Sequence, residues 1–159
     1  MSVDLSSFLN RATRVVVVGV GSDFRGDDSV GVEIVRKLRN RVRSPNVLIV
    51  EGGVAPENYT SQIRRFKPSH IILIDAADFG AKPGDVVFAD PAAISGRSIS
   101  THTIPLSVLA GYLKEQTGAE IMLLGIQPGQ VELGSKMCEA VKSSMNRVLD
   151  MLTEELKPK

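Results

Sequence analysis

The stretch VVVVGVGSDFRGDDSVGV, residues 15–32, combines a β-branched run, a glycine-rich turn and the start of a helix. The unbroken valine run predicts a strand that is buried on both faces, which is typical of parallel sheets. Val30, Ile34 and Leu38 then recur at helical spacing, behind an acidic N-terminal signal at residues 27–29. A buried strand followed directly by a helix is the first half of a βαβ unit, so this stretch predicts an α/β fold.

The same alternation continues to the end of the chain. We expect strands near residues 14–20, 47–50, 71–74, 85–88 and 121–126, and helices from near residues 27, 56, 105 and 135. The third and fourth strands are joined by a short link without a helix, so one of that pair is expected to run antiparallel. The prediction is a single three-layer domain over residues 1–159, with its core at about 14–156. Its sheet has five strands, mostly parallel, with helices on both faces.

Composition excludes several classes of protein. The chain has 159 residues and a net charge of +1, so no global field attracts nucleic acid or an anionic membrane. No apolar run reaches the ~20 residues that a membrane-spanning helix needs, and the N-terminal segment does not resemble a secretory signal. The single cysteine, Cys138, cannot form an internal disulfide, which predicts a reducing compartment and a cytoplasmic location. We expect Cys138 to be a buried structural thiol, and the basic clusters at 36–43 and 64–67 to be solvated helix ends rather than a docking patch.

Three side chains that can bind a metal follow or precede apolar runs. Asp28 follows the first predicted strand, Asp75 comes directly after the third, and His102 precedes the apolar helix from residue 105. In open α/β sheets, ligands bind beyond the carboxyl ends of the strands, and two carboxylates with one imidazole suit zinc or nickel. An acidic residue in a first helical turn is also a common cap, and a loop histidine commonly has no special role. Both interpretations stay open, and we predict that Asp28, Asp75 and His102 form a metal site.

Other residues at this edge are weaker candidates. Glu51 ends the second predicted strand, and we expect it to contact a substrate or to support the metal ligands. Asp27 and Asp78 have the same supporting role in the prediction, with a helix-start role for Asp27 and solvation for Asp78 as alternatives. The segment from Gly19 begins like a dinucleotide fingerprint, but Phe24 stands where its third glycine would be. The chain also lacks the P-loop, nucleophile-elbow and His-Glu-x-x-His patterns.

Short motifs along most of the chain make it resemble the hydrogenase maturation endopeptidases. The matching pieces are Gly19-Val-Gly-Ser with Gly26-Asp-Asp-Ser-Val-Gly31, Glu51-Gly-Gly, Ile74-Asp-Ala-Ala-Asp-Phe-Gly80, Thr101-His-Thr-Ile-Pro-Leu106 and Leu124-Gly-Ile-Gln-Pro128. The branch that serves formate-hydrogenlyase-type hydrogenases is the most similar. Two positions depart from the family pattern: Ser22 replaces a common Asn, and Glu51 replaces a common Asp.

The resemblance implies a reaction and a partner. These enzymes cut a C-terminal extension, after a basic residue, from the nickel-loaded large-subunit precursor of nickel-iron hydrogenases. By position, Asp28, Asp75 and His102 would recognise the nickel, which arrives with the precursor, although another divalent metal could occupy the site in the isolated protein. No general base is assigned, and Asp28 and Asp75 are candidates for activating a water. A nucleotide- or metal-binding α/β module without peptidase activity is the alternative, and a small-molecule metallohydrolase is a third possibility.

Overall fold

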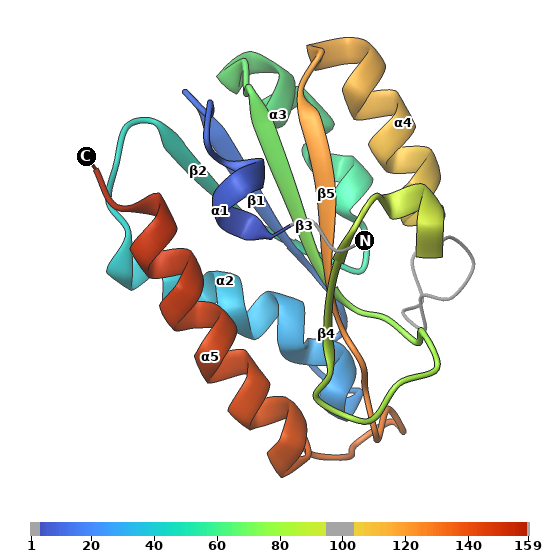
Figure 1. Cartoon of the computed structure of the whole chain (residues 1–159). Coiled ribbons are helices and arrows are strands. Elements are labelled where there is room, and N and C mark those ends of the chain that lie inside the picture. The colour runs from blue at the N-terminus through green and yellow to red at the C-terminus, as the bar shows by residue number, and fades with distance from the viewer. Residues whose placement is uncertain (1–3, 95–103, 159) are drawn as a thin grey trace.

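All five expected strands are present, and they form one sheet in the computed structural model, which describes residues 4–94 and 104–158 (Figure 1). The strands are β1 Val15–Val20, β2 Val47–Gly53, β3 His70–Ala76, β4 Val86–Ala89 and β5 Glu120–Ile126. Their order in the sheet is β2-β1-β3-β5-β4. The pairs β1–β2, β1–β3 and β3–β5 are parallel, and β4 is antiparallel to β5. The predicted mostly parallel α/β fold is therefore confirmed.

Helices cover both faces of this sheet and complete three layers (Figure 1). The α-helices are α1 Leu5–Phe8, α2 Val30–Arg41, α3 Thr60–Phe66, α4 Leu106–Thr117 and α5 Glu139–Leu156, with short 3-10 turns η1 Gly26–Ser29, η2 Pro56–Tyr59 and η3 Pro91–Ile94. Helices α2 and α5 lie on one face, and α3 and α4 lie on the other. None of the helices in the described ranges is both long and apolar enough to cross a bilayer.

The central strand β3 shows how the two apolar cores are divided. All of its residues are buried, which explains the continuous apolar run in the sequence. Ile72 and Ile74 belong to the core under α2 and α5, whereas Ile71 and Leu73 belong to the core under α3 and α4. Because side chains alternate along a strand, Asp75 lies on the α3 and α4 face of β3.

The antiparallel strand β4 does not pair with β3, although a short link joins the two in the sequence. β4 pairs with β5 and forms the edge of the sheet, with Val86 opposite Ile126. The edge of β3 is already taken by β5, which pairs with it along the whole strand. The link from β3 therefore carries the chain past β5, and α4 then brings it back into the gap.

The last helix begins later than the sequence pattern suggests. The expected start near Ser135 lies in a turn, where the Ser135 N–H and side-chain hydroxyl both donate to the Glu132 carbonyl oxygen. Cys138 has extended backbone angles and is the N-cap of α5, so the helix begins at Glu139. The short elements α1 and η3 were not expected from the sequence. The 3-10 turns η1 and η2 directly precede α2 and α3, at the places where the sequence pattern predicts the start of an α-helix.

Two glycines allow the start of α2 to lie directly on the sheet. A Cβ atom on Gly31 would overlap the carbonyl oxygens of Val20 and Ile74, and one on Gly19 would overlap the Gly31 carbonyl oxygen. The backbone of α2 therefore contacts the backbone of β1 and β3 without an intervening side chain. This contact sets the position of η1, which directly precedes α2.

Gly31→Ala should destabilise the protein strongly, because the atoms that the new methyl group would meet are backbone and cannot move aside. We expect a loss of about 3 kcal/mol or more in the free energy of unfolding, measured by urea denaturation. Gly111→Ala is the matched control, since Gly111 is also in a helix but has nothing within 4 Å of the place that a Cβ atom would occupy. That variant should gain about 0.5–1 kcal/mol. Equal effects of the two substitutions would contradict the backbone contact.

Candidate active site

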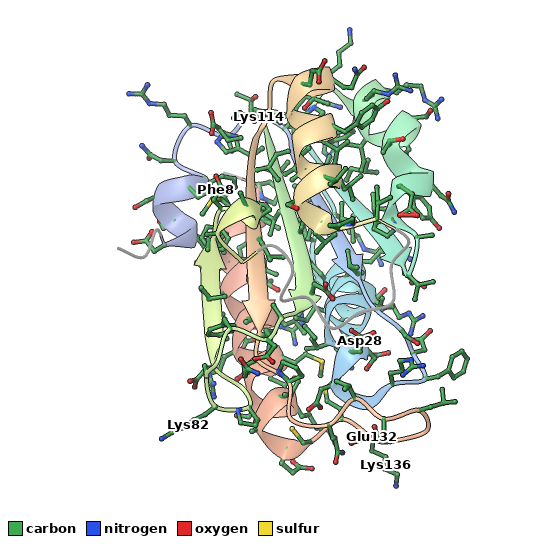
Figure 2. All side chains as sticks on the ribbon, turned by 90° about the vertical axis from the view of Figure 1, so that its right-hand side faces the viewer. Phe8, Asp28, Lys82, Lys114, Glu132 and Lys136 are labelled. Carbon is green, nitrogen blue, oxygen red and sulfur yellow. The ribbon has the colours of Figure 1, made fainter. Side chains whose placement is uncertain are left out.

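The carboxyl ends of β1 and β3 form the topological switch point of the sheet. From β1 the chain leaves through α2 on one face to β2, and it returns through α3 on the other face to β3. Ligands of open α/β sheets bind at such points. Asp28 lies in η1, which contacts β3, and Asp75 is the residue before the last of β3. Figure 2 shows Asp28 at this end of the sheet with Glu132 and Lys136, whereas Lys114 lies at the opposite end.

Both aspartates are removed from water. Asp28 is 1% exposed, and its Oδ2 atom accepts a 3.0 Å hydrogen bond from the Ser22 backbone N–H. Asp75 is fully buried and lies opposite Gly125 of β5. Burying a carboxylate is costly unless its charge is balanced. Two such residues at the switch point are therefore a strong candidate for a binding site, because oxygen donors suit divalent cations.

The third predicted ligand, His102, lies outside the described residues. Within residues 4–94 and 104–158, no group of three His, Cys, Asp or Glu side chains is arranged to hold a metal. The structure thus brings Asp28 and Asp75 to one switch point. Ile104 packs against the core under α3 and α4, which is the face that Asp75 occupies. The chain therefore continues from residue 104 on the same face as Asp75.

The Asp27 carboxylate holds a segment that is distant in the sequence. Its carboxylate does not cap η1 or α2. Instead, one oxygen accepts the backbone N–H groups of Gly129 and Gln130 at 2.7 and 2.8 Å, and the other accepts that of Cys138 at 2.7 Å. The carboxylate therefore binds a distant loop rather than capping a helix. Asp27 is fully buried and ties η1 to the loop between β5 and α5.

Cys138 is held by the same carboxylate. Its thiol donates a 3.1 Å hydrogen bond to Asp27 Oδ2. Burial, followed by the Asp27 carboxylate, raises the pKa of the Cys138 thiol. The side chain is only partly buried, but it stays protonated at neutral pH, and a thiol in this state is a poor nucleophile.

Glu51 is paired with Arg36, which belongs to the basic cluster that the sequence predicts to be a solvated helix end. Arg36 donates to both Glu51 carboxylate oxygens at 3.1 and 3.0 Å, and to both Asp23 carboxylate oxygens at 2.8 Å. It also reaches Glu33 at 3.0 Å. The hydrogen bonds from Arg36 hold the pKa of Glu51 below its usual range, and those to Glu51 and then Asp23 raise the pKa of Arg36. Glu51 is therefore ionised beside the switch point.

The loop after β3 is organised by Gln127, which sequence reasoning did not assign to the site. The buried Gln127 amide oxygen accepts the N–H groups of Phe79 and Ala81, and its amide nitrogen donates to Asp78 Oδ1 at 3.2 Å. Asp78 itself is exposed. Gln127 lies in the motif Leu124-Gly-Ile-Gln-Pro128, and this motif could have marked it as a residue of the site. No comparable local signal marked Arg36, because its partners come from two other segments.

Comparisons with known proteins agree on one family. The family model for hydrogenase maturation protease, HycI, matches residues 32–155. The hydrogenase 3 maturation protease of Escherichia coli K12 is 34% identical over 138 residues, which cover 86% of this chain and 87% of that protein. The crystal structure of a [NiFe] hydrogenase maturation protease HycI from Thermococcus kodakarensis KOD1 superposes with a TM-score of 0.88 at 39% identity, covering 96% of this chain and 97% of that one. The solution structure of the Escherichia coli endopeptidase HycI gives a TM-score of 0.79 at 33% identity, covering 89% and 90%.

Asp27→Asn should destabilise the protein more than Asp28→Asn. The amide that replaces the Asp27 carboxylate would turn an N–H₂ group toward backbone N–H donors, and a buried donor without an acceptor costs about 1–3 kcal/mol. We expect a loss of about 3 kcal/mol for Asp27→Asn and less than about 1 kcal/mol for Asp28→Asn, whose amide oxygen can still accept from Ser22. Chemical denaturation followed by circular dichroism measures both. Asp150→Asn on the exposed face of α5 is the control and should be close to neutral. An unfolding free energy for Asp27→Asn equal to that of the wild type would contradict the anchoring role.

Proposed function

Because the chain belongs to the hydrogenase maturation protease family and is therefore a peptidase, we propose that it removes the C-terminal extension of a [NiFe] hydrogenase large-subunit precursor. The observation that carries this proposal is the pair of buried aspartates, Asp28 and Asp75, at the switch point of the sheet. The match to the HycI family model and to a hydrogenase 3 maturation protease supports a substrate of the formate-hydrogenlyase type.

In this proposal the nickel belongs to the substrate. Asp28 and Asp75 supply oxygen ligands and His102 supplies a nitrogen ligand when the precursor brings its nickel to the switch point. Three protein ligands leave coordination positions open for groups of the precursor. Recognition of the metal then places the peptide bond that follows the mature C-terminus at this edge of the sheet, and a precursor without nickel lacks the group that is recognised.

The residues around the aspartates hold the site in shape. Ser22 fixes one oxygen of Asp28, and Asp27 fixes the loop that follows β5. Glu51 is kept ionised by Arg36 and is available to contact the substrate at the same edge. The low nucleophilicity of Cys138 agrees with a reaction in which a water, rather than a cysteine, attacks the peptide bond. Asp28 and Asp75 are the candidates for orienting that water.

The cellular compartment of the reaction can be inferred from the single cysteine. The free thiol of Cys138 fits a reducing compartment, and we place the reaction in the cytoplasm. Neither a nucleic acid nor a membrane has a role in it.

Nickel dependence is the direct test of the substrate. Purified precursor, with and without nickel, is incubated with the protein, and mass spectrometry measures the mature chain and the released peptide. We expect cleavage only of the nickel-loaded precursor. Equal processing of both forms would remove nickel recognition from the proposal, and processing of neither form would remove the substrate.

Asp28→Asn and Asp75→Asn should both be folded but inactive, because an amide binds a cation far more weakly than a carboxylate does. We expect cleavage of nickel-loaded precursor to slow by at least about a hundredfold. Asp150→Asn removes a carboxylate that is exposed on α5, so it should keep wild-type activity. Thermal melts establish that each variant is folded before its rate is compared. Wild-type rates for both Asn variants would show that these aspartates do not bind the nickel.

A further inference from the structure

Two large apolar side chains at the carboxyl edge are unusually exposed. Phe24 in the β1–η1 loop and Leu133 in the β5–α5 loop are each 72% exposed, and the next most exposed large hydrophobic residue of the described chain is Val108 at 56%. Scattered exposed apolar residues are normal on a protein surface. These two are not scattered, because the Gly134 N–H donates a 2.7 Å hydrogen bond to the Phe24 carbonyl oxygen. We call Phe24 and Leu133 the rim pair.

Phe24 is held on a fixed loop. Its N–H donates to Ser22 Oγ at 3.3 Å, and its carbonyl oxygen accepts from Gly134. The preceding residue, Asp23, is bound through both carboxylate oxygens to Arg36. The backbone is therefore restrained on both sides of an aromatic ring that is mostly in water.

Leu133 lies on a loop that is restrained in a similar way. The Asp27 carboxylate binds the start of this loop at Gly129 and Gln130, and its end at Cys138. Glu132, the residue before Leu133, accepts the N–H of Ser135 at 3.0 Å. Both members of the rim pair are thus presented by ordered backbone, which lowers the entropy cost of binding a partner.

We propose that the rim pair is the docking surface for the folded body of the hydrogenase large-subunit precursor, an inference that rests on the proposed function. The pair adjoins the site: Ser22, on the loop of Phe24, donates to the Asp28 carboxylate, and Glu132, next to Leu133, lies at the same end of the sheet as Asp28 (Figure 2). A protein that delivers a peptide bond to Asp28 and Asp75 approaches the end of the sheet at which the rim pair lies. Aromatic residues such as Phe are enriched at the cores of protein–protein interfaces, and a few large side chains buried there contribute most of the binding energy.

The experiment uses the full chain and purified nickel-loaded precursor. Phe24→Ala, Leu133→Ala and the double variant are compared with the wild type in steady-state cleavage and in direct binding by calorimetry. Each single substitution should raise KM and Kd by about tenfold while kcat changes by less than about twofold. Tyr112→Ala on α4 and Met151→Ala on α5 are the matched controls, because both side chains are exposed, at 42% and 41%, but lie on helices away from the rim. They should leave KM and Kd unchanged.

Failure of the inference differs from failure of the proposed function. If the wild type cleaves the precursor and the rim variants have wild-type KM and Kd, the docking surface is wrong while the function stands. If light scattering shows a wild-type dimer that becomes a monomer in the rim variants at unchanged KM, a second copy of this chain covers the pair and the inference is also wrong. If the wild type neither cleaves nor binds the precursor, the proposed function itself fails.

Discussion

The contact between the backbone of α2 and the backbones of β1 and β3 is the constraint on which the site depends. Gly31 lies against the carbonyl oxygens of Val20 and Ile74, and Gly19 faces Gly31. Side chains at these glycines would push the helix outward. Because η1 directly precedes α2, the contact fixes Asp28 beside the end of β3, where Asp75 is located. The close packing of one helix backbone on the backbones of two strands thus places the candidate ligands.

The adjacent residues Asp27 and Asp28 are both buried, and their different hydrogen-bond partners separate their roles. Asp27 accepts the N–H groups of Gly129, Gln130 and Cys138, so its charge is used to fold the loop after β5. Asp28 accepts the N–H of Ser22 and lies at the switch point. The first residue therefore anchors the loop after β5, and the second is the candidate for ligand binding. Burial, together with the hydrogen bond to the same Asp27 carboxylate, raises the pKa of the Cys138 thiol.

Long-range polar contacts hold the loops around the switch point. Arg36 joins the β1–η1 loop to β2 through Asp23 and Glu51, and Gln127 joins the loop after β3 to the end of β5. Partly exposed ion pairs such as those of Arg36 add little to global stability, but they fix local geometry. A site that must accept part of another folded protein gains from this, since loops that are already ordered lose less entropy on binding.

The sequence by itself determined the five strands, the parallel α/β class, the family resemblance and the placement of Asp28 and Asp75 at strand ends. The strands, the fold class and the placement of the two aspartates follow from short-range periodicity and from the rule that parallel strands end at one edge. The family resemblance rests on short motifs. Only the tertiary structure decided that β4 pairs with β5, that Asp27 anchors a distant loop, that α5 begins after Cys138 and that Arg36 binds Glu51. Each of these depends on which distant segments meet, and local patterns carry no information about that. The role of His102 stays a prediction of the sequence, because it lies outside the described residues.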